Sequence, residues 1–297
     1  MTAQRPSLTS AHERIKVDKN IRRGCGRAHR KGENSMSYGR IGVIGAMDSE
    51  LAALIAALAQ PARETVQGLT FHTGLLSGRP VVLVRCGIGK VSAARCTQVL
   101  IDRFAPAAVI NTGIAGGLGA GLAVGDIVVA DGLVQHDFDA APIGFVRGCL
   151  CMGDPGAPTV FTPDEPLSAL LARTAGDAAG AQRVHRGLIA TGDRFISGAA
   201  EKAAIRSAFP SAMAAEMEGG AVAQAASMSG VPFAVVRAIS DLADGTAAAS
   251  FEQFALLWLF LQFIRPYDTM KPSRPANRRL IGGCSKGGLQ WGFGFLC

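Results

Sequence analysis

The chain between residues 39 and 262 alternates short, continuous apolar runs with longer segments whose apolar residues recur every three or four positions. Apolar runs bounded by glycine, proline or polar residues are typical of buried strands, and the longer spacing is typical of amphipathic helices. The pattern predicts strands at 40–45, 69–76, 79–87, 107–111, 126–130, 186–190, 212–216 and 232–239. It predicts helices at 48–59, 90–104, 167–178, 199–209 and 219–229.

This alternation of strands and helices indicates an α/β protein with a largely buried sheet. Neither a repeat nor a linker interrupts residues 39–262, so we predict one domain there. A glycine loop is predicted at 113–121, within NTGIAGGLGAG, where backbone can approach a ligand closely. The loop lacks the Gly-Lys-Ser/Thr of a phosphate-binding loop and the acidic residue of a dinucleotide fingerprint.

The two ends of the chain do not continue the pattern. Residues 1–38 lack apolar periodicity, and we predict a disordered or non-native extension with Met36 as the natural start. Residues 263–297 form an atypical basic tail. This tail is either a real extension or the product of a shifted reading frame.

The charge distribution separates the ends from the middle. The whole chain carries +7 with a pI near 9.3, which by itself favours a nucleic-acid or membrane-surface partner. Residues 40–262, however, hold 15 basic against 19 acidic residues, so the basicity belongs to the two ends. A basic nucleic-acid-binding protein is therefore supported by the ends alone, and we predict neither nucleic acid nor membrane as a partner.

The seven cysteines follow no disulfide or metal-ligand spacing. We therefore expect reduced thiols in the cytoplasm, with no metal and no cofactor. There is no sign of a secretory signal. The apolar run from Phe254 to Ile264 is well short of the roughly 20 residues that a membrane helix needs.

Carboxylates stand where predicted strands end or helices begin, and ligands of open α/β sheets bind beyond the carboxyl ends of strands. Glu50, Glu218 and Asp241 fit that position. Cleavage of a glycosidic bond needs an acid for the leaving group and a base for water, and a third carboxylate can hold a sugar hydroxyl. Asp241 ends a strongly apolar strand, which favours its protonated form and suits it to the acid role.

Each of these residues also has a purely structural interpretation. Glu50 could stabilise the first turn of its helix, and Asp241 could cap a turn. Glu216 and Glu218 flank Met217, and we predict that they do not both face the core, one of them being solvated or capping a helix.

Three further residues carry structural expectations. In the HDFDA segment, His136 and Asp137 could form a structural hydrogen-bonded pair. Arg237 lies within an apolar strand and must find acidic partners.

Eight segments in order resemble the 5′-methylthioadenosine/S-adenosylhomocysteine nucleosidases, whose fold is that of the purine nucleoside phosphorylases. They are IGVIGAMDSE, GIGKVSAA, INTGIAGGL, VGDIVVAD, HDFDA, ATGDRFIS, AEMEGGAVA and VPFAVVRAISDLAD. The resemblance covers about 40–256. It implies a three-layer sandwich with a mixed central sheet, and hydrolysis of the N-glycosidic bond of both nucleosides to adenine and the thioribose in methionine salvage.

The resemblance also implies catalytic roles for four residues. Glu50 matches the base that activates water, and Arg237 matches the arginine near that water. Asp241 matches the acid that protonates adenine N7, and Ser240 matches the residue that orients it.

The implied substrate-binding residues lie in three segments. Glu218 matches the carboxylate that holds the ribose hydroxyls, beside Met217 under the sugar. The full implied set is Ala115, Gly116, Phe195, Ile196, Glu216, Met217 and Glu218. Phe195 and Ile196 match the pair that stacks on and hydrogen-bonds adenine, while Ala115 and Gly116 match a loop on the ribose side.

The resemblance further implies a homodimer in which the segment after the HDFDA motif closes the partner's thioalkyl pocket. Two departures concern that specificity: Ile114 stands where a serine is frequent, and Phe145 is the available aromatic residue in a short AAPIGFVRG segment. Two alternatives stay open: a phosphate-dependent phosphorylase on the same fold, and a nucleosidase for another adenine or hypoxanthine nucleoside.

Overall fold

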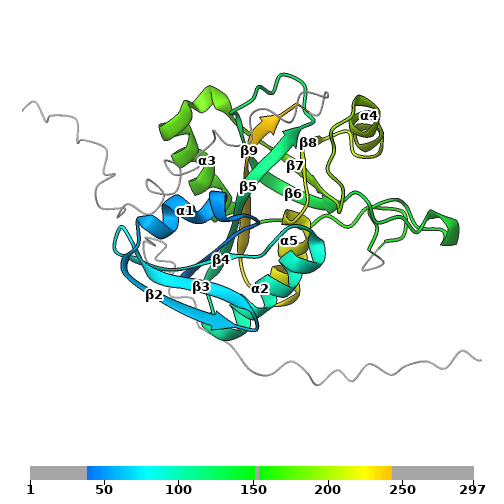
Figure 1. The fold of residues 1–297 in the computed structure, drawn as a ribbon. Helices are drawn as coiled ribbons and strands as arrows, with labels where there is room; N and C mark the ends of the chain where they lie inside the picture. Colours follow the sequence, from blue (N-terminus) through cyan, green and yellow to red (C-terminus); the bar gives the residue numbers. More distant parts are fainter. Residues whose placement is uncertain (1–38, 151–153, 243–297) are drawn as a thin grey trace, which may run out of the picture. The chain divides into compact units, whose positions relative to one another are not determined.

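The structure is a computed structural model that describes residues 39–150 and 154–242 (Figure 1). These residues form a nine-stranded mixed sheet with helices on both faces. The strands are β1 (Ile41–Gly45), β2 (Ala59–Val66), β3 (Leu69–Leu76), β4 (Arg79–Arg85), β5 (Ala108–Gly117), β6 (Ile127–Gln135), β7 (Val184–Thr191), β8 (Ala212–Glu216) and β9 (Phe233–Asp241). The α-helices are α1 (Asp48–Ala56), α2 (Lys90–Phe104), α3 (Glu165–Ala179), α4 (Ala199–Ala208) and α5 (Gly219–Met228). Short 3₁₀ turns lie at Ala141–Ile143 and Ala181–Arg183.

The strand order is β2-β3-β4-β1-β5-β8-β7-β6-β9, and β9 also pairs with β5. Strands β4, β1, β5 and β9 run parallel, so their carboxyl ends meet at one edge. Because β9 pairs with β5 on one side and with β6 on the other, the five strands from β5 to β9 close on themselves. This closure brings the ends of β5, β8 and β9 close together.

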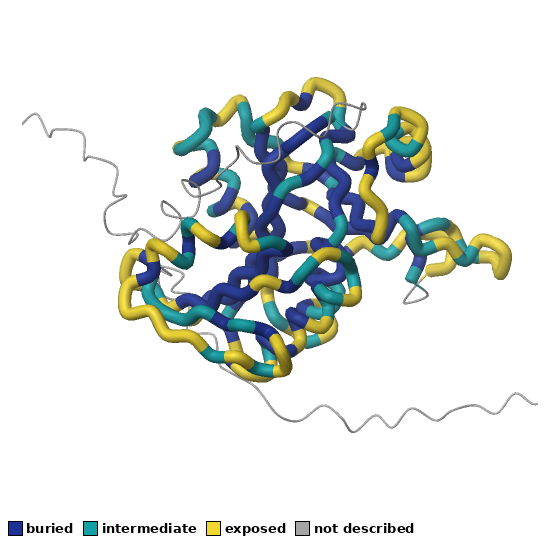
Figure 2. Tube along the Cα trace, in the orientation of Figure 1, coloured by how far each residue is buried: buried dark blue, intermediate teal, exposed yellow. Residues whose placement is uncertain are grey.

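Two apolar layers hold the helices against the sheet. Helices α1 and α3 pack with one face of β1, β4, β5, β6 and β9, and α2 and α5 pack with the opposite face. Strands β1, β4, β5, β6, β8 and β9 are buried along most of their length and lie in the dark core of Figure 2. The predicted class, a mixed and mostly buried sheet between helical layers, is confirmed.

The first predicted helix is wrong at its end. It was expected to run to residue 59, but α1 ends at Ala56 and the chain turns into β2, which the sequence did not predict. Strand β2 is exposed at six of its eight positions and lies at the edge of the sheet. Its side chains show no apolar alternation because they have no second layer to pack against.

The predicted glycine loop is also wrong over its first half. Strand β5 continues through Gly117, so Ala115 and Gly116 lie on a strand. A Cβ atom at Gly113 would come within 2.8 Å of Glu50 Oε1, and one at Gly117 within 3.1 Å of Leu242. The glycines therefore serve close packing inside a strand.

Residues 1–38, with Met36, and the basic tail at 263–297 lie outside the described residues. Among the helices at 39–150 and 154–242, none is both long and apolar enough to cross a membrane.

Candidate active site

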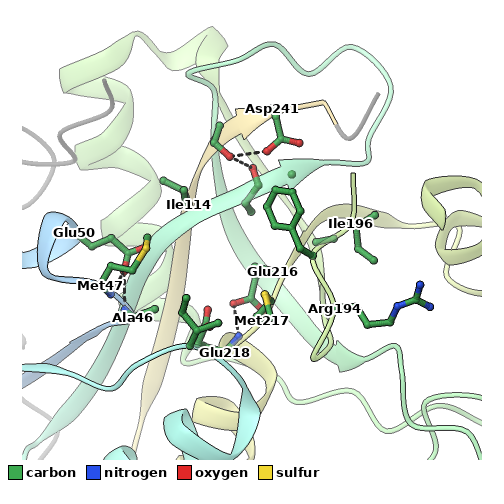
Figure 3. A pocket seen from close by; sticks show the side chains of 16 residues that line it. Ala46, Met47, Glu50, Ile114, Arg194, Ile196, Glu216, Met217, Glu218 and Asp241 are labelled. Carbon is green, nitrogen blue, oxygen red and sulfur yellow. Dashed lines mark hydrogen bonds between the residues drawn. The ribbon is translucent and has the colours of Figure 1, made fainter. Parts of the chain in front are cut away.

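One pocket collects nearly all of the predicted site residues at the carboxyl ends of β1, β5, β8 and β9 (Figure 3). Ten of the eleven line it: Glu50, Ala115, Gly116, Phe195, Ile196, Glu216, Met217, Glu218, Ser240 and Asp241. The exception is Arg237, which is fully buried behind the wall. Segments separated by almost 200 residues thus converge on one cavity, because the parallel strands β1, β5 and β9 end there and the end of β8 lies beside β5.

Glu50 reaches the pocket from the first turn of α1. Its Oε2 accepts backbone N–H groups of Ala46 at 2.6 Å and of Met47 at 3.0 Å. Burial raises the pKa of Glu50, although the positive charge of Arg237 and backbone hydrogen bonds oppose the shift. The two backbone hydrogen bonds therefore hold the Glu50 carboxylate in place, and its raised pKa favours its acceptance of a proton.

Arg237 is the buried cation predicted to need acidic partners. Its guanidinium donates to Glu216 Oε2 and to Asn111 Oδ1, each at 2.5 Å, and also to the backbone oxygens of Asn111 and Val236. Asn111 in turn donates to the Ile44 carbonyl at 3.0 Å. The ion pair therefore joins β9, β8 and β5, and Asn111 links it to β1.

Glu216 and Glu218 are both buried, so the expectation that only one could face inward is wrong. Residues two positions apart on a strand share a face, so alternation gives no reason to separate these two side chains. Strand β8 ends at Glu216, and Glu218 immediately precedes α5. Glu216 also accepts the Thr191 hydroxyl and the backbone N–H groups of Glu218 and Gly219. Burial alone would raise the pKa of Glu216, but the Arg237 charge and these hydrogen bonds hold it below its usual range.

Glu218 lies two residues further on and has fewer compensating partners. Its Oε1 accepts the Gly89 backbone N–H at 2.9 Å. Burial and the nearby negative charge of Glu216 raise the pKa of Glu218 to about 7. Near neutral pH this carboxyl group is therefore able to donate as well as accept a hydrogen bond.

Asp241 is the last residue of β9 and is buried. The Ser240 hydroxyl lies 2.8 Å from Asp241 Oδ2 and 3.3 Å from the Ala115 carbonyl oxygen. These contacts fix the carboxyl group opposite Glu50, across the pocket (Figure 3).

Phe195 covers another side of the pocket and is 63% exposed. Ile196 beside it is buried, and Met217 lies between the two glutamates (Figure 3). An exposed aromatic ring in a pocket wall is available to stack on a planar ligand.

The sequence prediction missed six lining residues: Ala46, Met47, Ile88, Ile114, Arg194 and Ala215. Ile114, Arg194 and Ala215 directly adjoin predicted residues, and Ile114 had been noted only because a serine is frequent at that position. The other three had no signal beyond lying near a strand end. The predicted hydrogen-bonded pair of His136 and Asp137 is wrong. Within the described part of the chain neither ring nitrogen of His136 has a hydrogen-bond partner, whereas Asp137 binds Lys90 and Asp193.

Comparisons with known proteins agree with this geometry. Residues 40–259 match the model of the phosphorylase superfamily. The 5′-methylthioadenosine/S-adenosylhomocysteine nucleosidase of Actinobacillus succinogenes is 43% identical over 215 residues, which are 72% of this chain and 91% of that protein. The chain belongs to this nucleosidase family.

Solved structures of the nucleosidase family and its neighbours share the fold. The Neisseria meningitidis enzyme, in complex with methylthio-immucillin-A, has a TM-score of 0.70 and 37% identity, covering 76% of this chain and 98% of that one. A futalosine hydrolase mutant from Helicobacter pylori has a TM-score of 0.68 and 29% identity, covering 76% and 98%. The proteins that share this fold therefore include a futalosine hydrolase as well as the methylthioadenosine/S-adenosylhomocysteine nucleosidases.

We expect Arg237→Met to lower the free energy of unfolding by about 3–5 kcal/mol, because it leaves Glu216 buried without its counterion. The double variant Arg237→Met/Glu216→Gln should recover much of this loss, since no buried charge remains. Urea unfolding of both variants measures the difference. Equal losses in the single and double variants would contradict the ion-pair interpretation.

We expect Glu218 to make stability pH-dependent. Its folded-state pKa is raised, so its contribution is fully present below about pH 4.5 and is lost as the pH rises through about 7. The free energy of unfolding relative to a Glu218→Gln variant should fall by about 3 kcal/mol between pH 4.5 and 8. Urea unfolding at several pH values measures this, and parallel profiles for the two proteins would disprove the assignment.

Proposed function

We propose that this protein hydrolyses the N-glycosidic bond of 5′-methylthioadenosine and S-adenosylhomocysteine, releasing adenine and the thioribose. The single observation that carries the proposal is the convergence of Glu50, Glu218 and Asp241 on one pocket with an exposed aromatic wall. Membership of the nucleosidase family supports the choice of substrates.

The proposed chemistry divides between two sides of the pocket. Asp241, oriented by the Ser240 hydroxyl, protonates the departing adenine at N7. Glu50, whose pKa is raised by burial, takes a proton from water as that water attacks the sugar carbon. Glu218 holds the ribose hydroxyls, and Phe195 stacks on the base, with Ile196 offering its backbone.

Arg237 acts through its neighbours in this scheme. Its guanidinium is occupied by Glu216 and Asn111, and its charge also acts on Glu50. Glu216 itself has protein partners on both oxygens, so it supports the wall that Met217 and Glu218 form.

The charge of the pocket favours water over phosphate as the nucleophile. Among the described residues that line it, Arg194 is the one cation, and Arg194 pairs with Glu201 at its side. Several carboxylates lie in the same wall, and they repel an anion. The charge of the pocket therefore argues against the phosphate-dependent phosphorylase alternative.

A homodimer and a cytoplasmic location remain predictions. The exposure of Ile88 (58%) and Phe195 (63%) in the pocket wall supports a second copy covering this side, because large apolar groups are normally shielded.

The first test is adenine release from methylthioadenosine in phosphate-free buffer. We expect turnover without phosphate and no sugar phosphate when phosphate is added. A panel with adenosine, inosine and futalosine tests for the other nucleosidases. Strict phosphate dependence, or a preference for another nucleoside, would refute the proposed function.

The second test removes the acid and the base separately. Glu50→Gln and Asp241→Asn should each lower kcat by roughly 10²–10⁴-fold, since each removes a proton-transfer group without changing side-chain size. Glu64→Gln and Asp102→Asn, at surface positions away from the pocket, are matched controls and should retain normal turnover. Near-normal turnover of Glu50→Gln or Asp241→Asn would remove that residue from its role.

A further inference from the structure

Three side chains outside the pocket tie together the loops around it. Asp137 follows β6, Asp193 follows β7, and Lys90 begins α2. Asp137 accepts the Lys90 ammonium through Oδ1 at 2.6 Å and the Asp193 backbone N–H through Oδ2 at 2.8 Å. Asp193 Oδ1 accepts the Lys90 backbone N–H at 2.8 Å. The three contacts form a closed ring.

This ring adjoins two walls of the pocket. Gly89, just before Lys90, donates its backbone N–H to Glu218 at 2.9 Å. On the other side, Asp193 directly precedes the lining residues 194–196, which include Phe195. The start of α2 thus binds Glu218 on one side. On the other side it binds Asp193, which precedes Phe195 in the pocket wall.

The packing at this junction leaves little freedom. Gly89 has a φ of +94°, and a Cβ atom there would lie 3.0 Å from Asp193 Oδ1. The side chains of Lys90 and Asp137 are only 18% exposed. Burial alone would raise the pKa of Asp137, but the hydrogen bonds from Lys90 and Asp193 hold it below its usual range. The Lys90–Asp137 ion pair is therefore partly shielded from water, whereas Asp193 is exposed.

We propose that Asp137 and Asp193 are positioning residues that hold the Phe195 wall against the start of α2 and so set the affinity for the base of the nucleoside. Neither carboxylate lines the pocket, so neither takes part in bond cleavage. The inference rests on the proposed function for the identity of the ligand.

The test compares Asp193→Ala, Asp193→Asn and Asp137→Ala in the full chain. The two alanine variants should raise KM for methylthioadenosine about tenfold, the effect of losing a hydrogen bond to a charged acceptor, and should leave kcat within about twofold. The inhibition constant of free adenine should rise by the same factor. Asp193→Asn should restore both constants, because its amide oxygen can still accept the Lys90 N–H.

Glu165→Ala is the matched control. It also removes a carboxylate from an ion pair, with Arg186, but away from the pocket. It should leave KM and the adenine constant unchanged. A fall in kcat at constant KM in the Asp193→Ala variant, or an Asp193→Asn variant as weak as alanine, would overturn the positioning role.

Hydrogen exchange separates this inference from the proposed function. Asp193→Ala should speed amide exchange in segments 87–92 and 192–198, and Asp193→Asn should not. A wild-type protein that releases no adenine would refute the function and leave this measurement valid. Unchanged exchange in both segments would refute the positioning role even in an active enzyme.

Discussion

The buried ion pair between Arg237 and Glu216 is the constraint on which the rest of the site depends. A guanidinium and a carboxylate removed from water are tolerated only when nearly every polar atom finds a partner in good geometry. Here those partners come from β5, β8 and β9 and from the turn into α5. The need to supply hydrogen-bond partners to this ion pair therefore fixes the relative positions of the strand ends. Residues at the same strand ends line the pocket.

The same pair sets the electrostatics of the pocket. One buried positive charge lies near Glu50, Glu216 and Glu218, and of these three carboxylates it forms its ion pair with Glu216. Glu216 therefore stays ionised, whereas burial raises the pKa of Glu50 and Glu218. The raised pKa of Glu50 suits a group that accepts a proton from water, and Glu218, with a pKa of about 7, can both donate and accept hydrogen bonds near neutral pH.

Much of the fold could be predicted because buried elements carry a strong local signal. The strand at Ala212–Glu216 was predicted at its observed bounds, and the central strands were found with errors at their ends. Strand β2 and the second half of β5 were missed for different reasons. Strand β2 is an exposed edge strand without a hydrophobic face, and the glycines of β5 owe their presence to neighbours such as Glu50, far away in sequence.

The sequence by itself determined the fold class, the domain core, the family resemblance and the acidic residues at strand ends, because each depends on local pattern or on short contiguous motifs. Only the tertiary structure decided that ten predicted residues share a pocket and that Arg237 stands behind its wall. It also decided that Glu216 and Glu218 are both buried, and that Asp137 bonds to Lys90 and Asp193. These facts depend on which strand ends the closed sheet brings together, and no local pattern encodes contacts between residues a hundred positions apart.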